Sequence, residues 1–186
     1  MTDLCRYRKQ LTSDQKVEID ALLANSSSKD DIDIGQCDLI KHRIDLLPGF
    51  EVTFKQRQRR IPPNMIDEVR QHLDELLSPG IIRKYKSPWA GNVVLIRKKN
   101  GKLRMCVDYR ALNDRSITDA YTLPRIEEVF DILKGSRYFS TIDMKAVYHQ
   151  VEIEDKHKER TAFTVGPLGF FEYVKMPFGL SNRQAT

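Results

Sequence analysis

The 186-residue chain contains 31 Lys and Arg residues, 26 Asp and Glu residues and three cysteines, and its formal net charge is +5. Hydrophobic residues make up 40% of the sequence and charged residues 31%, a balance typical of a soluble globular protein that argues against a disordered chain. No apolar run approaches the roughly 18 residues of a spanning helix, and residues 1–10 lack the apolar core of a signal peptide. The cysteines match neither a zinc spacing nor a disulfide framework. We therefore expect an intracellular, cytoplasmic protein with no membrane partner.

The positive charge is concentrated in one part of the chain. Residues 51–110 hold 14 basic and 6 acidic side chains, whereas residues 1–50 and 111–186 are slightly acidic. Such a basic block favours a polyanionic partner, for example nucleic acid or a nucleoside triphosphate. A solvated basic surface is the alternative.

The first 36 residues are predicted to form a lead-in. Thr12 and Gln15 have the spacing of a capping box, and the apolar residues that follow predict a short helix ending near Ala24. Residues 25–36 are polar and predict a linker.

Two elements and a basic segment are predicted next. Residues 39–46 alternate enough for a strand, and residues 64–77 have apolar positions at helical spacing. Between them, Lys55, Arg57 and Arg59 fall on one side of an extended segment. These cations could contact a nucleic-acid backbone or be solvated.

A β-hairpin is predicted over residues 92–109, because two β-rich runs flank Asn100-Gly101, which a type I′ turn prefers. A two-residue loop would pair Arg97 with Arg104. One face would then carry four cations, Arg97, Lys99, Lys102 and Arg104, and the other face would carry Val94, Ile96, Met105 and Val107. Clustered cations predict an anionic ligand, and a lysine-protected edge ribbon is the alternative.

The last part of the chain is predicted to alternate helix and strand. A helix over Ile126–Leu133 precedes a strand over 138–144, and further strands cover 160–165 and 170–176. Asp143 is an isolated carboxylate in an otherwise apolar strand, and its desolvation requires a metal ion or a hydrogen-bond donor. A salt bridge or a helix N-cap would also satisfy it.

Three blocks, in this order, resemble reverse transcriptases of gypsy-type long-terminal-repeat retrotransposons. Residues 87–113 (SPWAGNVVLIRKKNGKLRMCVDYRALN) are similar to the fingers of these enzymes. Residues 139–150 (FSTIDMKAVYHQ) look like the palm strand that carries their first catalytic aspartate, and residues 176–182 (MPFGLSN) resemble the block that follows. Three long blocks in order are far more specific than one short motif.

The resemblance implies an α+β, right-hand polymerase fold with a mixed, largely antiparallel sheet and short helices. Residues 1–36 would be the lead-in helix and polar linker, residues 37–120 the fingers region with the basic hairpin, and residues 121–186 an incomplete palm. The activity implied is RNA-directed DNA polymerisation. Its partners would be an RNA or DNA template-primer, deoxynucleoside triphosphates and the remainder of a Pol polyprotein.

The metal chemistry of the family implies a role for Asp143. This aspartate would be a catalytic residue that binds two Mg²⁺ ions, with the backbone carbonyl of Met144 as a further metal ligand. Arg104 matches the triphosphate-binding arginine of the family. Its lysine partner aligns with Lys98, whereas the predicted register places Arg97 beside Arg104, so both remain nucleotide-binding candidates.

Three further residues take roles from the resemblance. Tyr148 aligns with the aromatic residue that excludes the 2′-hydroxyl of a ribonucleotide, Phe178 with a residue against the nucleotide, and Arg110 with one that supports the template. Without the family, Tyr148 would be read as a core residue, and the four histidines are read as ordinary packing or surface residues.

The sequence also departs from the family. It ends before the Tyr-x-Asp-Asp motif that supplies two further carboxylates, so we expect these 186 residues to be inactive alone. Ala146-Val147 replaces the usual Ser-Gly, and Arg183-Gln184 replaces Ala-Pro. The alternatives are a non-catalytic module that binds nucleic acid or nucleotide, and an unfolded relic.

Overall fold

The computed structural model describes residues 12–26, 35–99, 101, 103–119, 124–136, 139 and 146–184. These residues divide into two units, which are considered separately. The smaller contains the described parts of residues 1–33 and 124–145, and the larger those of 34–123 and 146–186. Within these ranges no helix combines the length and the apolar character that crossing a membrane requires.

The smaller unit contains helices α1 (Ser13–Ser26) and α4 (Ile126–Leu133). At the start of α1, the Gln15 N–H donates to Thr12 Oγ1 (3.3 Å) and the Thr12 N–H donates to Gln15 Oε1 (3.1 Å), which confirms the predicted capping box. Helix α4 has the predicted bounds. The strand predicted at 138–144 lies outside the described residues apart from Phe139, so Asp143 and Met144 have no described geometry.

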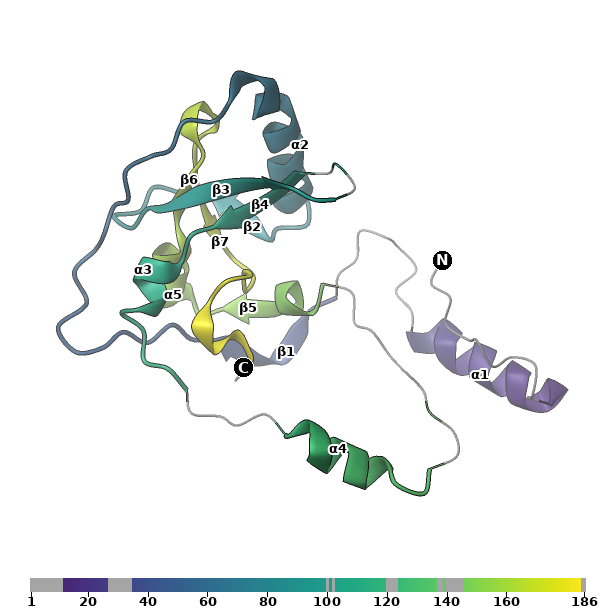
Figure 1. Ribbon diagram of the computed structural model, residues 1–186. Helices are drawn as coiled ribbons and strands as arrows, with labels where there is room; N and C mark the ends of the chain where they lie inside the picture. The colour runs from purple at the N-terminus through teal and green to yellow at the C-terminus, as the bar shows by residue number, and fades with distance from the viewer. Residues whose placement is uncertain are drawn as a thin grey trace. The chain divides into compact units, whose positions relative to one another are not determined.

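The larger unit is built on a mixed sheet with the strand order β2-β7-β6-β3-β4 (Figure 1). Its strands are β2 (Ile82–Lys84), β3 (Gly91–Arg97), β4 (Leu103–Val107), β6 (Phe163–Thr164) and β7 (Phe170–Tyr173). β3 and β6 are parallel, and the other neighbours are antiparallel. Separately, β1 (Cys37–His42) pairs in parallel with β5 (Val151–Ile153). The predicted α+β fold with a mixed sheet is confirmed.

Helix α2 (Ile66–Leu77), which follows the 3₁₀ turn η2 (Pro63–Met65), packs against β4 and buries Val69 and Leu73. In Figure 1 this helix lies beside the β3–β4 hairpin. The predicted helix at 64–77 is therefore confirmed. The remaining helical turns are α3 (Arg110–Asn113), η3 (Val147–Gln150), α5 (Asp155–Lys158), η4 (Glu159–Thr161), η5 (Gly166–Leu168) and η6 (Ser181–Gln184).

Several strands are shorter than predicted. The strand expected at 160–165 begins only at Phe163, because Thr161 closes a helical turn by donating from Oγ1 to the Lys158 carbonyl (2.7 Å). The same hydroxyl accepts the Tyr173 N–H (2.9 Å), which ties that turn to the end of β7. The strand expected at 39–46 runs instead from Cys37 to His42.

The hairpin forms where predicted, but its register is wrong by one residue. Arg97 pairs with Leu103, and Ile96 pairs with Arg104. The Gly101 N–H donates to the Lys98 carbonyl (2.9 Å), and Gly101 has a φ of 78°, so the loop contains an extra left-handed residue. A slip of one residue moves side chains to the opposite face of a strand pair. The predicted four-cation face is therefore a wrong prediction.

Candidate nucleotide-binding site

Two aromatic residues expected at a nucleotide pocket lie in contact, although thirty positions separate them in the sequence. The rings of Tyr148 in η3 and Phe178 meet edge to face, with centroids 5.2 Å apart and planes at 78°. Phe178 is 51% exposed, so one face of this pair is open to solvent. Such an arrangement offers an apolar, partly open wall against which a sugar or a base can pack.

His149 packs against Phe178 and helps to fix its position. Its ring contacts the Phe178 ring edge to face (5.4 Å) and stacks on Tyr173 (6.5 Å), while its Nδ1 lies 3.2 Å from the Met176 carbonyl oxygen. Burial lowers the pKa of His149, and the bond to the Met176 carbonyl acts in the opposite direction. The histidine is thus a packing residue, as predicted, and it connects η3 to the turn that carries Phe178.

The turn after Phe178 is attached to the base of the hairpin through Asn113. The Asn113 side chain donates from Nδ2 to the Gly179 carbonyl (2.8 Å) and accepts the Ser181 N–H at Oδ1 (3.0 Å). Gly179 has a φ of 100°, and a Cβ at this position would lie 3.6 Å from the Tyr109 ring and 3.8 Å from the Val107 carbonyl. The aromatic pair therefore lies next to the end of β4.

Arg104 lies on the same strand, three residues from Val107 and hence about 10 Å along β4. It is exposed and shares the outer face of the hairpin with Ile96, which is 50% exposed. Continued alternation beyond Arg97 brings Lys98 to the same side as Arg104. In the observed register Ile96, and not Arg97, lies opposite Arg104.

Arg97 points to the opposite face and contacts α2. Its Nη1 lies 2.7 Å from the Glu68 carboxylate and 3.0 Å from the Gly101 carbonyl oxygen. Glu68 also accepts the Leu103 N–H (3.1 Å), so a single carboxylate holds both strands near the hairpin tip. The prediction that Arg97 and Arg104 share a face is wrong, because the hairpin loop is longer than two residues.

Arg110, the predicted template residue, begins α3 and is held by Asp108. The guanidinium donates from Nε (2.9 Å) and Nη2 (2.7 Å) to the two carboxylate oxygens, a bidentate pair. This bond is the main reason why the pKa of Asp108 lies below its usual range. The Arg110 side chain is nevertheless 81% exposed, so its outer edge can still meet an anion.

The predicted metal site cannot be located on the described residues. Among them, no group of three or more His, Cys, Asp or Glu side chains is placed to hold a metal ion. The donors that the resemblance supplies, the Asp143 carboxylate and the Met144 carbonyl, are hard oxygen ligands and fit the chemistry of Mg²⁺.

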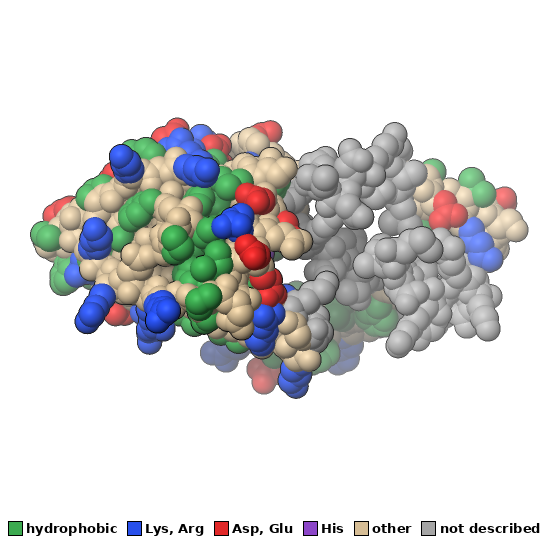
Figure 2. Space-filling model, turned by 90° about the horizontal axis from the view of Figure 1, so that it is seen from above, with side chains coloured by type: hydrophobic (Ala, Val, Ile, Leu, Met, Phe, Trp, Pro, Cys, Tyr) green, Lys and Arg blue, Asp and Glu red, His purple; other side chains and the backbone are tan. Residues whose placement is uncertain are grey.

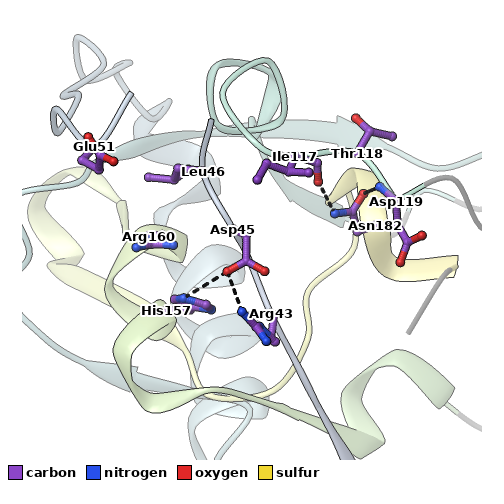
Figure 3. Close-up of a pocket in the computed structure, with 10 residues that line it drawn as sticks. All are labelled: Arg43, Asp45, Leu46, Glu51, Ile117, Thr118, Asp119, His157, Arg160 and Asn182. Carbon is purple, nitrogen blue, oxygen red and sulfur yellow. Dashed lines mark hydrogen bonds and ion pairs between the residues drawn. The ribbon is translucent and has the colours of Figure 1, made fainter. Parts of the chain in front are cut away.

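A separate cleft of about 740 Å³ lies in the larger unit (Figure 3). On its floor, the buried His157 accepts the Ile44 N–H at Nδ1 (3.0 Å), and its Nε2 lies 3.9 Å from Asp45, which also pairs with Arg43 (3.1 Å). Burial lowers the pKa of His157, and the charge of Arg160 lowers it further. Within this cleft Asp45 is the acidic partner of Arg43, and the lining contains none of the predicted site residues.

Comparison with known proteins gives a family for part of the chain and solved structures with a similar fold. Residues 96–183 match the family described as reverse transcriptase (RNA-dependent DNA polymerase). The fold resembles prototype foamy virus protease-reverse transcriptase, with a TM-score of 0.77 and 21% identity over 94% of this chain and 24% of that one. The foamy viral protein in complex with an RNA/DNA hybrid gives 0.72 and 19% identity over 95% and 24% of the two chains.

The sequence is also similar to transposon polyproteins. It is 37% identical to the retrovirus-related Pol polyprotein from transposon 297 of Drosophila melanogaster over 64% of this chain and 12% of the relative. It is 35% identical to the transposon Tf2-3 polyprotein of Schizosaccharomyces pombe over 73% and 11%. The chain thus spans about an eighth of the length of the curated relatives it matches. It contains a reverse transcriptase domain related to the Pol polyproteins of long-terminal-repeat retrotransposons.

Proposed function

We propose that the chain contains the nucleotide-binding part of an RNA-directed DNA polymerase, with the fingers region over residues 37–120 and the beginning of the palm over residues 121–186. The observation that carries this proposal is the contact between Tyr148 and Phe178 at the base of the strand that bears Arg104. An aromatic pair beside a strand that carries an arginine suits a ligand with a nucleoside part, whose sugar and base faces can pack on the rings, and a charged triphosphate.

The outer face of the hairpin would bind the triphosphate. Arg104 forms no ion pair with any described residue, so its guanidinium is available for bidentate contact with phosphate oxygens. Lys98 would add a second, point-like positive charge. Arg97 would support this face indirectly, because its pair with Glu68 fixes the hairpin on α2.

Tyr148 and Phe178 would shape the pocket for the sugar. A tyrosine held edge to face by a second ring has little freedom to move aside, so a 2′-hydroxyl would meet it rather than displace it. Arg110, anchored by Asp108, would contact the template phosphates.

Mg²⁺ would be held by the Asp143 carboxylate and the Met144 carbonyl. When bound, it would supply charge stabilisation for the transferred phosphoryl group. The hard-oxygen donors fit this ion, but one carboxylate is too few to hold a pair of divalent cations. We therefore propose that the 186-residue polypeptide binds substrate without extending a primer.

The test is equilibrium binding of dTTP to the 186-residue protein in the presence of poly(rA)–oligo(dT) and Mg²⁺. We expect Arg104→Ala to weaken binding about tenfold, the loss typical of one charge-assisted phosphate contact. Arg70→Ala, which removes an equal charge from the outer side of α2, should leave affinity unchanged. Equal affinities for all three proteins would contradict the proposal.

Primer extension on the same template tests separately whether the 186-residue polypeptide is inactive as a polymerase. We expect no product. Extension that disappears in Asp143→Asn would show that the polypeptide is active, and would leave the binding result intact.

A further inference from the structure

We propose that Asn113 and Asn182 are positioning residues that set the preference of the nucleotide pocket for a deoxyribose over a ribose. Neither side chain touches the nucleotide in this account. Each acts through the turn that carries Phe178, and Phe178 in turn supports Tyr148. The inference rests on the proposed nucleotide pocket and adds to it the contacts that fix the position of its aromatic wall.

The Asn113 amide bridges two backbone groups of the turn that follows Phe178. Its Nδ2 donates to the Gly179 carbonyl (2.8 Å), and its Oδ1 accepts the Ser181 N–H (3.0 Å). A side-chain amide offers a donor and an acceptor at its two ends, and only one orientation of the amide satisfies both of these bonds. The turn is therefore held at two points, two residues apart, by one side chain.

Asn182 makes the same kind of bridge in the opposite direction. Its Nδ2 donates to the Ile117 carbonyl (2.6 Å) and its Oδ1 accepts the Asp119 N–H (3.1 Å), as Figure 3 shows. Asn113 thus reaches from the segment after β4 to the Phe178 turn, and Asn182 reaches back from that turn to the same segment. We call these two side chains and their four hydrogen bonds the asparagine clamp.

The segment that anchors the clamp is itself fixed at both ends. Asn113 closes α3, and its N–H donates to the carbonyl of Tyr109 (2.8 Å), a buried residue whose hydroxyl donates to the Thr161 carbonyl (2.9 Å). At the other end, the Ile117 N–H donates to the Asp45 carbonyl (2.8 Å). The clamp therefore ties the Phe178 turn to a part of the chain that is held by the core.

Phe178 needs this support because its own ring is held on one side. The side chain is 51% exposed, and its aromatic contacts among the described residues are with Tyr148 (5.2 Å) and His149 (5.4 Å), both in η3. A small rotation of the turn would separate the Phe178 ring from Tyr148. Tyr148 could then move aside, and a 2′-hydroxyl would enter the pocket more easily, since selectivity depends on side chains held within about 1 Å.

The measurement is the ratio of the dissociation constants for UTP and dUTP, with poly(rA)–oligo(dT) and Mg²⁺ present. Lys and Arg side chains are spread over the face of the larger unit seen in Figure 2, and they attract any triphosphate. Because UTP and dUTP carry the same charge and the same base, this attraction cancels in the ratio. A lower folded fraction in a variant cancels as well, so the ratio reports contacts at the 2′ position.

Asn113→Ala and Asn182→Ala should each lower this ratio about threefold by improving UTP binding, an effect in the range of one lost neutral hydrogen bond. Asn113→Asp keeps the acceptor for the Ser181 N–H and should lower the ratio less. Asn92→Ala is the matched control, because Asn92 Nδ2 donates to the Arg57 carbonyl (2.6 Å) in another part of the larger unit. The control should keep the ratio of the unaltered protein.

Amide hydrogen exchange measures the clamp without any nucleotide. In Asn113→Ala the peptide that contains Ser181 should exchange about threefold faster than in the unaltered protein, because its N–H loses an acceptor. In Asn92→Ala the exchange of this peptide should not change. Unchanged exchange in Asn113→Ala would overturn the proposal, since the clamp would then not hold the turn.

An unchanged ratio in both alanine variants of the clamp would also overturn the proposal, as would an equal decrease in Asn92→Ala. If Asn113→Ala fails to fold by circular dichroism, Asn113→Asp and Asn182→Ala serve instead, and an unchanged ratio in both has the same meaning. Failure of the pocket proposal has a different signature. In that case the unaltered protein itself would show no preference for dUTP, whereas failure of the clamp alone would leave the preference intact in every variant.

Discussion

Arg97 and Glu68 form an ion pair of 2.7 Å that joins the hairpin to helix α2. The pair exists because Arg97 faces inward, the reverse of the orientation predicted from a two-residue loop. Both side chains are partly exposed, so the contact contributes only about 0.5–1 kcal/mol by itself. Its importance lies in position, since the same carboxylate accepts the Leu103 N–H and holds the second strand.

The different contacts of Arg97 and Arg104 predict different effects of their substitution on the free energy of unfolding. Arg97→Ala should lower the free energy of unfolding by about 1 kcal/mol, because it removes the ion pair and the bond to the Gly101 carbonyl. Arg104→Ala should leave the free energy of unfolding within about 0.5 kcal/mol of the unaltered protein, because it contacts no acidic partner among the described residues. Urea denaturation of both variants measures the difference. Equal destabilisation would contradict the observed register.

Ala146, immediately before η3, adopts a left-handed conformation with φ 49° and ψ 39°. This conformation costs an L-residue about 1–2 kcal/mol. Glycine avoids that cost, but ordering its more flexible backbone on folding costs about 0.5–1 kcal/mol more than ordering that of alanine. Ala146→Gly should therefore stabilise the protein by about 0.5 kcal/mol. Ala162→Gly is the matched control, since Ala162 has a φ of −62°, and it should destabilise. Thermal unfolding measures the stability of both variants. A change of stability with the same sign in both would contradict backbone strain at Ala146.

Buried histidines predict a loss of stability in mild acid. Burial lowers the pKa of His42 to about 4, with a further contribution from the charge of His157. Between its ordinary value near 6.5 and about 4, the unfolded chain takes up a proton that the folded chain does not. The free energy of unfolding should therefore fall with decreasing pH in this window, by up to about 1.4 kcal/mol per pH unit for this group.

The variant His42→Leu should reduce that slope, whatever its effect on stability at neutral pH. His72→Leu provides a comparison, because His72 lies on the partly exposed side of α2 near Glu75. Urea denaturation at a series of pH values gives both slopes. A slope in His42→Leu identical to that of the unaltered protein would exclude His42 as the source.

The helices and the hairpin could be predicted from local patterns, and their finer geometry could not. Capping residues at Thr12 and apolar spacing in α2 are local signals, and both helices form where expected. The hairpin register depended on one left-handed residue, Gly101, whose conformation the dipeptide alone does not specify. The Asn113 bonds to Gly179 and Ser181 join segments more than sixty residues apart and have no periodic signature.

The candidate site was predicted mainly by resemblance rather than by pattern. Nothing in the spacing of Tyr148 and Phe178 indicates contact, yet their rings meet at 5.2 Å. His149, interpreted from sequence as an ordinary packing residue, proves to link these two segments through the Met176 carbonyl. Side chains that bind backbone carbonyls across the fold are not visible in a single sequence, which is why this support was missed.

The most direct test of the nucleotide pocket compares dTTP with UTP. Both bind opposite the same template base, and they differ at the 2′ position that Tyr148 is proposed to face and in the base methyl group. With poly(rA)–oligo(dT) and Mg²⁺, the 186-residue protein should bind dTTP at least about tenfold more tightly than UTP, and dUTP should match dTTP. Tyr148→Ala should remove most of this preference by improving UTP binding. Equal affinity of the unaltered protein for dUTP and UTP, or a preference unchanged in Tyr148→Ala, would contradict the proposed pocket.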